Sequence, residues 1–216
     1  MRFAPQPPDG PSLADQAVHR STARLVGERT EEAEQLMAAA TEVMVRLGFE
    51  RRATVADIVK SAGLSNQAFY RHFASKDDLI AALVDAGARR LAAYVARRMA
   101  AVTEPDEQIR TWINGVLAQA ADPAVAAPTR AVAWNRSALE VGADSDARQA
   151  EPMIWALLEA PLAAAGVADP AGDAYLIGRL AFAVLIDVLW ADPPPSLAEL
   201  EFVTDFVTAR FRHPTG

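Results

Sequence analysis

Apolar residues recur every three or four positions through most of the chain after Thr30, which is the spacing of amphipathic helices. The first such helix has Thr30 as a candidate N-cap and ends before Gly48, and its apolar face carries Leu36, Ala40, Val43, Met44 and Leu47. No stretch alternates between apolar and polar residues for long enough to predict a strand. The pattern therefore predicts an all-α protein.

Three more helices are predicted to follow closely, each after a hydroxyl side chain that suits an N-cap. Thr54 precedes a helix over 55–62, with Asp57 in place for a capping box, and Ser65 precedes a helix over 66–73. Ser75 precedes a long helix that meets no breaker before Pro105. The later part of the chain is predicted to form helices over about 106–121, 129–141, 146–165, 172–191 and 196–212.

The same pattern divides the chain into three parts. Residues 1–29 are predicted to be a flexible N-terminal extension, because 1–11 hold four of the fourteen prolines. Within this extension, 12–28 are compatible with either a short amphipathic helix or flexible chain. Residues 30–76 are predicted to be a three-helix domain, and 77–216 a larger helical domain.

Charge is distributed unevenly between these parts. The net charge is −7, yet residues 1–76 carry ten Lys or Arg and nine Asp or Glu, whereas residues 77–216 carry eleven and nineteen. Because nucleic-acid binding needs a local basic surface rather than a basic protein, the acidic C-terminal part does not exclude a DNA partner.

Composition argues against catalysis and metal binding. The chain has no cysteine, which excludes disulfides and thiolate metal sites. Its three histidines, His19, His72 and His213, suggest no metal pair, and neither a glycine-rich phosphate loop nor a Ser-His-Asp set is present. We therefore predict that the protein is not an enzyme and has no cofactor.

The most apolar stretch, 174–191, contains Arg179 and Asp187, which are costly in a bilayer. This favours a buried helix over a membrane span. The N-terminus lacks the apolar core of a signal peptide, so a cytoplasmic location is predicted.

The helices predicted over 55–62 and 66–73 are joined by Ala62-Gly63-Leu64-Ser65, which is the spacing of a helix-turn-helix. The residues that would wedge the two helices together are Ile58, Val59, Leu64, Phe69 and Phe73. In such a motif the second helix presents its first residues to the major groove. The side chains so placed are Asn66, Gln67, Tyr70, Arg71 and His72; the alternative is that they form only the solvated face of a short helix.

The run TVADIVKSAGLSNQAFYRHFASKDDLIAALV resembles the tetracycline-repressor (TetR) family in its Thr-Val, Asp-Ile, Ala-Gly-Leu-Ser, Tyr-x-His-Phe and Ser-Lys-Asp elements. The resemblance covers about residues 30–85. It implies that Thr54 and Lys76 touch phosphates, and that the helix after Ser65 reads bases. The amides of Asn66 and Gln67 are suited to adenine, Arg71 is suited to a guanine or a phosphate, and Ala68 is suited to a thymine methyl. Tyr70 and His72 are expected to contact the DNA backbone. The alternative for His72 is that it packs against the hairpin. The implied DNA-binding residues are Thr54, Ser65, Asn66, Gln67, Ala68, Tyr70, Arg71, His72 and Lys76.

Two features depart from the family pattern. The first helix begins with Glu31, Glu32 and Glu34 instead of basic residues, so attraction to phosphate is expected from Arg20, Arg24, Arg29, Arg51 and Arg52. Gln67 stands where the family often has glycine, which adds a side chain able to read a base.

The resemblance also implies a homodimer on a double-stranded DNA operator. The apolar segment 174–190 is expected to pair with 151–165 in a four-helix dimer bundle; the alternative is a central helix of a monomer. An effector cavity in the C-terminal domain is expected to bind a small hydrophobic molecule through Trp112, Trp134, Asn135, Trp155, Phe182 and Asp187. The tryptophans would otherwise be core residues, and Asp187 would otherwise pair with Arg179 or Arg136.

These features together predict a ligand-responsive DNA-binding regulator, a repressor that its effector releases from the operator. Effector binding is expected to shift the packing of the helix over 75–99 and so change the separation of the two reading helices. The alternative is a TetR-like DNA-binding protein controlled by a protein partner, without a small-molecule effector.

Overall fold

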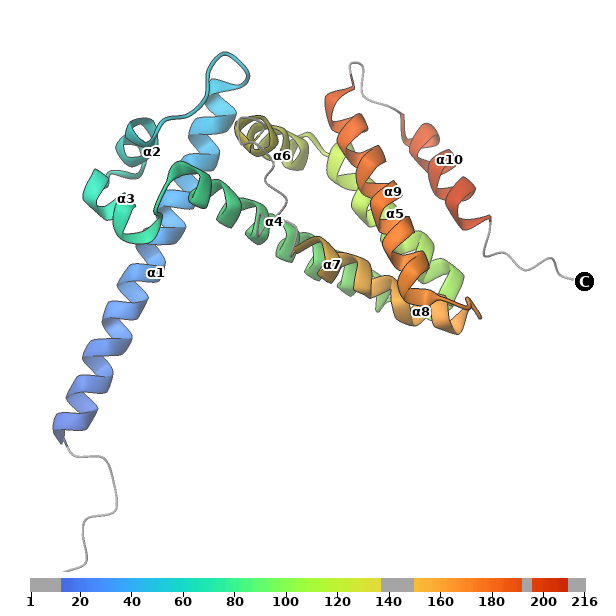
Figure 1. Ribbon diagram of the computed structural model, residues 1–216, viewed down its shortest axis with the longest axis horizontal. Helices are drawn as coiled ribbons and strands as arrows, with labels where there is room; N and C mark the ends of the chain where they lie inside the picture. The colour runs from blue at the N-terminus through green and yellow to red at the C-terminus, as the bar shows by residue number, and fades with distance from the viewer. Residues whose placement is uncertain (1–12, 137–149, 192–195, 210–216) are drawn as a thin grey trace, which may run out of the picture.

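The computed structural model describes residues 13–136, 150–191 and 196–209 (Figure 1). These residues form helices and no strand, so the predicted all-α fold is confirmed. The proline-rich start, the junction between the helices predicted over 129–141 and 146–165, and His213 lie outside the described residues. The helices are α1 (Leu13–Leu47), α2 (Val55–Ala62), α3 (Asn66–His72), α4 (Lys76–Met99), α5 (Pro105–Ala121), α6 (Pro123–Arg136), α7 (Ala150–Trp155), η2 (Ala156–Leu158), α8 (Glu159–Ala164), α9 (Pro170–Trp190) and α10 (Leu197–Thr208).

Helix α1 is longer than the sequence predicted, because it runs through Thr30 instead of beginning there. Residues 13–29 contain no proline and a single glycine, and extending an existing helix is much easier than starting a new one. Thr30 therefore lies inside α1, where there is no helix N-terminus for it to cap. The N-terminal half of α1 projects beyond α2 and α3 in Figure 1.

The second half of α1 packs with α2, α3 and the start of α4 around one hydrophobic cluster, the N-terminal core. The predicted apolar face of α1 is confirmed at Leu36, Ala40, Val43 and Met44, all of which are buried. The helix-turn-helix wedge is also confirmed, since Ile58, Val59, Phe69 and Phe73 are buried and Leu64 is half-buried.

A second cluster, the C-terminal core, joins the end of α4 to α5, α7, α8 and α9. Helix α4 belongs to both cores: Leu79 and Leu83 lie in the N-terminal core, and Val95 and Met99 in the C-terminal core. Helix α6 does the same over a shorter distance, with Ala131 in the first core and Ala126 in the second. The two domains are therefore connected by shared helices, and α4 runs from one to the other in Figure 1.

Helix α9 has two different faces. Its buried face, which includes Ile177, Ala181 and Leu185, packs on the C-terminal core. At Gly178 the indole of Trp155 lies so close to the helix that any side chain would collide with it, so this close approach requires glycine. The exposed large apolar residues of α9 are Tyr175, Leu176, Leu180, Ile186 and Trp190.

The segment expected to join this helix in a dimer bundle packs against α9 within the same chain. The segment over 151–165 is divided into α7, η2 and α8, and its apolar side chains, including Ile154, Leu158 and Leu162, are buried in its own core. Helix α10, which packs against α5, exposes Phe202 and Phe206. Among the described residues, no helix is both long and apolar enough to cross a membrane.

Candidate DNA-binding site

Local hydrogen bonds shape the helix-turn-helix. Thr54 caps α2: its Oγ1 accepts from the backbone N–H of Asp57 (3.2 Å), while Asp57 Oδ2 accepts from the Thr54 N–H (3.0 Å). Gly63 ends α2 in the left-handed conformation, with φ of 66°, which glycine adopts without steric cost. Ser65 Oγ then caps α3 by accepting from the Ala68 N–H (3.1 Å). The predicted caps and turn are confirmed.

Helix α3 has one side on the core and one in solvent. Phe69 is buried in the N-terminal core, whereas Asn66, Gln67, Tyr70 and Arg71 are exposed. The exposed side chains present amide, phenol and guanidinium groups, which suit hydrogen bonding to base edges and phosphates.

Ala68 is the exception among the residues expected to face DNA. Its side chain is 3% exposed, because it lies on the same side of the short helix as Phe69. The expectation that Ala68 meets a thymine methyl is therefore corrected: the methyl group faces the protein interior.

Glu32 of α1 contacts two residues at the end of α3. Its Oε2 lies 2.8 Å from His72 Nε2 and 3.5 Å from Arg71 Nη1. The hydrogen bond from His72, followed by the positive charge of Arg71, lowers the pKa of Glu32. His72 was expected either to contact the DNA backbone or to pack against the hairpin. Its side chain is 9% exposed, so it packs against the protein. In the sequence Glu32 stands out only as a departure from the family pattern, and no local signal relates it to His72, forty positions away.

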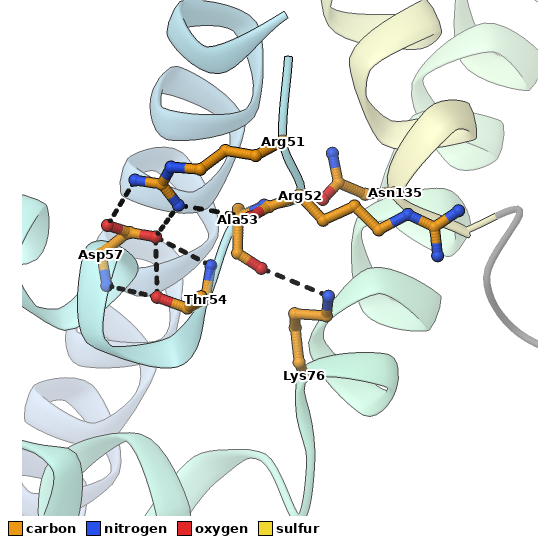
Figure 2. A network of polar contacts seen from close by, with 7 residues as sticks. All are labelled: Arg51, Arg52, Ala53, Thr54, Asp57, Lys76 and Asn135. Carbon is orange, nitrogen blue, oxygen red and sulfur yellow. Dashed lines mark hydrogen bonds and ion pairs between the residues drawn. The ribbon is translucent and has the colours of Figure 1, made fainter. Parts of the chain in front are cut away.

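The turn before α2 is held by residues from three other elements, as Figure 2 shows. Arg51 forms a two-pronged ion pair with Asp57 of α2 (2.7 and 3.0 Å), and this contact, with the hydrogen bonds from Thr54, holds the pKa of Asp57 well below its usual range. Lys76 Nζ, at the start of α4, donates to the Ala53 carbonyl (3.2 Å). Asn135 Oδ1, on α6, accepts from the Ala53 N–H (3.1 Å). Thr54 stays exposed beside this network, as does Ser65 at the start of α3.

The six side chains expected around an effector do not form one group. Trp112 is buried in the C-terminal core, where its Nε1 donates to the Ile154 carbonyl (2.9 Å). Trp155 packs edge-on against Tyr175 and Phe182, with ring centroids 5.3 and 6.4 Å apart. The Trp155 Nε1 is buried without an acceptor among the described residues.

The other three expected effector residues lie elsewhere. Trp134 and Asn135 are at the contact between α6 and the turn before α2, where Trp134 meets Phe49. Asp187 is exposed on α9. Asn135 does point inward as expected, but its partners are backbone groups of the protein. Among the described residues, no group of three or more acidic or histidine side chains is placed to hold a metal ion.

Comparison with known proteins agrees with this geometry. Residues 36–83 match the family model described as bacterial regulatory proteins of the tetR family. No curated protein matches the chain. Among solved structures, a transcriptional regulator from Rhodococcus sp. Rha1 has a TM-score of 0.63 at 22% identity, covering 83% of this chain and 95% of that one.

Two fatty-acid regulators named FadR have the same fold. The fatty acid degradation regulator from Bacillus halodurans has a TM-score of 0.61 at 18% identity, covering 85% of this chain and 96% of that chain. The protein from Bacillus subtilis, solved in complex with stearoyl-CoA, has a TM-score of 0.55 at 19% identity, covering 82% and 96%. The family predicted from the sequence is thereby confirmed: the chain carries the N-terminal module of the tetR family of bacterial regulatory proteins on the fold of its solved regulators.

Proposed function

We propose that this protein is a cytoplasmic transcriptional repressor that binds a two-fold DNA operator as a homodimer and is released by a small hydrophobic effector. One observation carries the proposal. Helix α3 is fixed to the N-terminal core by Phe69, while Asn66, Gln67 and Arg71 are exposed on its outer side. A short helix mounted in this way is suited to the major groove.

Side-chain chemistry indicates which residues would contact bases and which would contact phosphates. Asn66 and Gln67 can each bond an adenine edge with two hydrogen bonds, and Arg71 can do the same for guanine. Ser65 and Tyr70 have exposed hydroxyl groups suited to phosphates, whereas the exposed Thr54 hydroxyl donates to Asp57 Oδ2 (2.7 Å) and would have to turn from it to donate to a phosphate. Lys76 uses one of its three ammonium protons on Ala53, so two remain for a phosphate.

The homodimer is supported by the exposed apolar faces of α9 and α10. Tyr175, Leu176 and Leu180 on α9, with Phe202 and Phe206 on α10, are large side chains that remain in water in one copy. A second copy related by a two-fold axis would cover both faces with the same residues. Such a pair presents two α3 helices, which must lie about 34–36 Å apart to enter successive major grooves.

The effector proposal centres on Trp155 and Phe182 in the C-terminal core. The Trp155 N–H is buried with no acceptor in the described part of the chain, which is costly, and a ligand oxygen would satisfy it. The surrounding aromatic rings favour an apolar body attached to that oxygen. The stearoyl-CoA in the structure of FadR from Bacillus subtilis supports acyl compounds as the first class to test.

Release would pass along α4, which is packed into both cores. A ligand that repacks the C-terminal core would tilt α4 and change the separation of the two α3 helices. Ligand and DNA would then weaken each other's binding by the same factor.

The test begins with selection of bound duplexes from a random pool, followed by fluorescence anisotropy on the selected sequence against random competitor. A preference of at least about a thousandfold, the usual ratio for specific sites, is expected. Titration with stearoyl-CoA, shorter acyl-CoA thioesters and free fatty acids should then release the DNA. No preference for any duplex would refute DNA recognition. Recognition without release by any compound would favour control by a protein partner.

A further inference from the structure

We propose that Asn135 of α6 is a positioning residue through which the C-terminal domain holds the DNA-facing start of α2; this inference rests on the DNA-binding function proposed above. The Asn135 side chain is 1% exposed, although asparagine is rarely buried to that extent. Its Oδ1 accepts from the Ala53 N–H (3.1 Å) and its Nδ2 donates to the Ala131 carbonyl in its own helix (2.9 Å). The amide therefore joins α6 directly to the backbone of the turn before α2.

The bond to Ala53 controls where Thr54 lies. Ala53 is itself buried, so its N–H must find a partner inside the protein. Asn135 holds that N–H and Lys76 holds the Ala53 carbonyl, so the backbone is fixed on both sides of the Ala53 Cα (Figure 2). Thr54 is the next residue, and it is both the cap of α2 and a proposed phosphate contact.

The neighbouring aromatic contacts extend this link into the C-terminal domain. Trp134 on α6 meets the Phe49 ring edge-on (5.5 Å between centroids) and lies beneath the guanidinium of Arg52 (5.6 Å). Phe49 also contacts Trp190, the last residue of α9 (5.4 Å). A movement of α6 against α9 must therefore either carry the turn with it or break the bond between Asn135 and Ala53.

The consequence is a second connection to the DNA, through α6, in addition to the one through α4. Loss of the Asn135 oxygen would leave the Ala53 N–H buried without a partner, and the turn would relax to expose it to water. Thr54 would then sample several positions, of which only some fit a phosphate. We expect about tenfold weaker operator binding in a protein that remains folded.

The experiment replaces Asn135 by leucine, which has a similar volume and no acceptor. Asn135→Ser, whose hydroxyl is too short to reach Ala53, serves as a second variant if the leucine variant proves unfolded by circular dichroism. Thr129→Val is the matched control, because it removes a hydrogen bond within α6 to the Val125 carbonyl (2.8 Å) that does not reach the turn. Operator affinity is measured by anisotropy, and exchange of the Ala53 amide hydrogen is measured by NMR in the full chain.

The expected result is a faster Ala53 amide exchange and about tenfold weaker binding for the Asn135 variant, with the Thr129 variant unchanged. The affinity loss should also shrink in a Thr54→Ala background, since a positioning residue acts through the group that it places. A general loss of stability would not show this dependence on Thr54. Unchanged affinity, or a loss that adds fully to that of Thr54→Ala, would overturn the proposal.

Failure of the proposed function is distinguishable from failure of this inference. If the unaltered protein prefers no duplex, the DNA-binding function fails. The Ala53 amide exchange still reports whether Asn135 holds the turn.

Discussion

Replacing Phe202 and Phe206 together by alanine is expected to dissociate the proposed dimer. The two rings stand four residues apart on α10 and are 70% and 72% exposed in one copy. Full burial of a phenylalanine stabilises by about 1.5–3 kcal/mol, so the remaining fraction is worth about 1–2 kcal/mol for each ring. The dimer contains four such rings, which gives about 4–8 kcal/mol, or roughly three to six powers of ten in the dimer Kd.

Sedimentation equilibrium over a wide concentration range measures this dimer Kd. Alanine is the best helix former, so circular dichroism should show that the α10 helix is retained in the variant. Val45→Ala is the control, because Val45 is an exposed apolar residue (41%) on α1, outside the proposed interface. A change of less than tenfold in the Kd of the double variant would refute the assignment of α10 to the interface.

Three further outcomes follow from the N-terminal domain. Phe69→Ala should lower the free energy of unfolding by about 3–5 kcal/mol in chemical denaturation, and a loss below about 1 kcal/mol would contradict its place in the core. Arg71→Ala should weaken binding to the selected operator by about 1–3 kcal/mol in anisotropy, and unchanged binding would exclude it from the interface. Glu32→Gln should lower the free energy of unfolding most near neutral pH. The reason is that a carboxyl whose pKa is lowered in the folded state stabilises the fold at a pH above its ordinary pKa of 4.5, and this stabilisation is lost as the pH falls. A stability difference that stays constant from neutral to acidic pH would contradict the contact between Glu32 and His72.

The starts of the short helices were predictable because their causes are local. Thr54, Ser65 and Ser75 each accept a hydrogen bond from the backbone N–H three residues later, and such caps are visible in a few letters of sequence. The start of α1 was not predictable in the same way. Thr30 has the residues of a cap around it, but whether they act as one depends on whether the preceding chain is already helical.

The contacts between distant segments could not be predicted from the sequence. Asn135 was recognisable as a polar residue on an inward face, yet its partner is 82 positions away in a turn that is defined only by the fold. In the sequence an inward amide of this kind indicates a ligand anchor, whereas in the structure its oxygen accepts from the Ala53 N–H. The exposure of Asp187 likewise depends on which face of an evenly apolar helix meets its own core, and hydrophobic periodicity in α9 does not decide this.

The number of connections between the domains decides how movement can reach the DNA. A single shared helix such as α4 could bend between Leu83 and Val95 and absorb a rearrangement of the C-terminal core. The second attachment is made by α6, whose Asn135 accepts from the Ala53 N–H, while Lys76 at the start of α4 donates to the Ala53 carbonyl. Attachment through two helices fixes the orientation of a rigid body where attachment through one does not, so the N-terminal core must turn when α6 and α4 move relative to each other. A change in the C-terminal domain would then alter the orientation of the two α3 helices as well as the distance between them. An effector that changes the angle between α4 and α6 would therefore misalign both α3 helices with the DNA grooves.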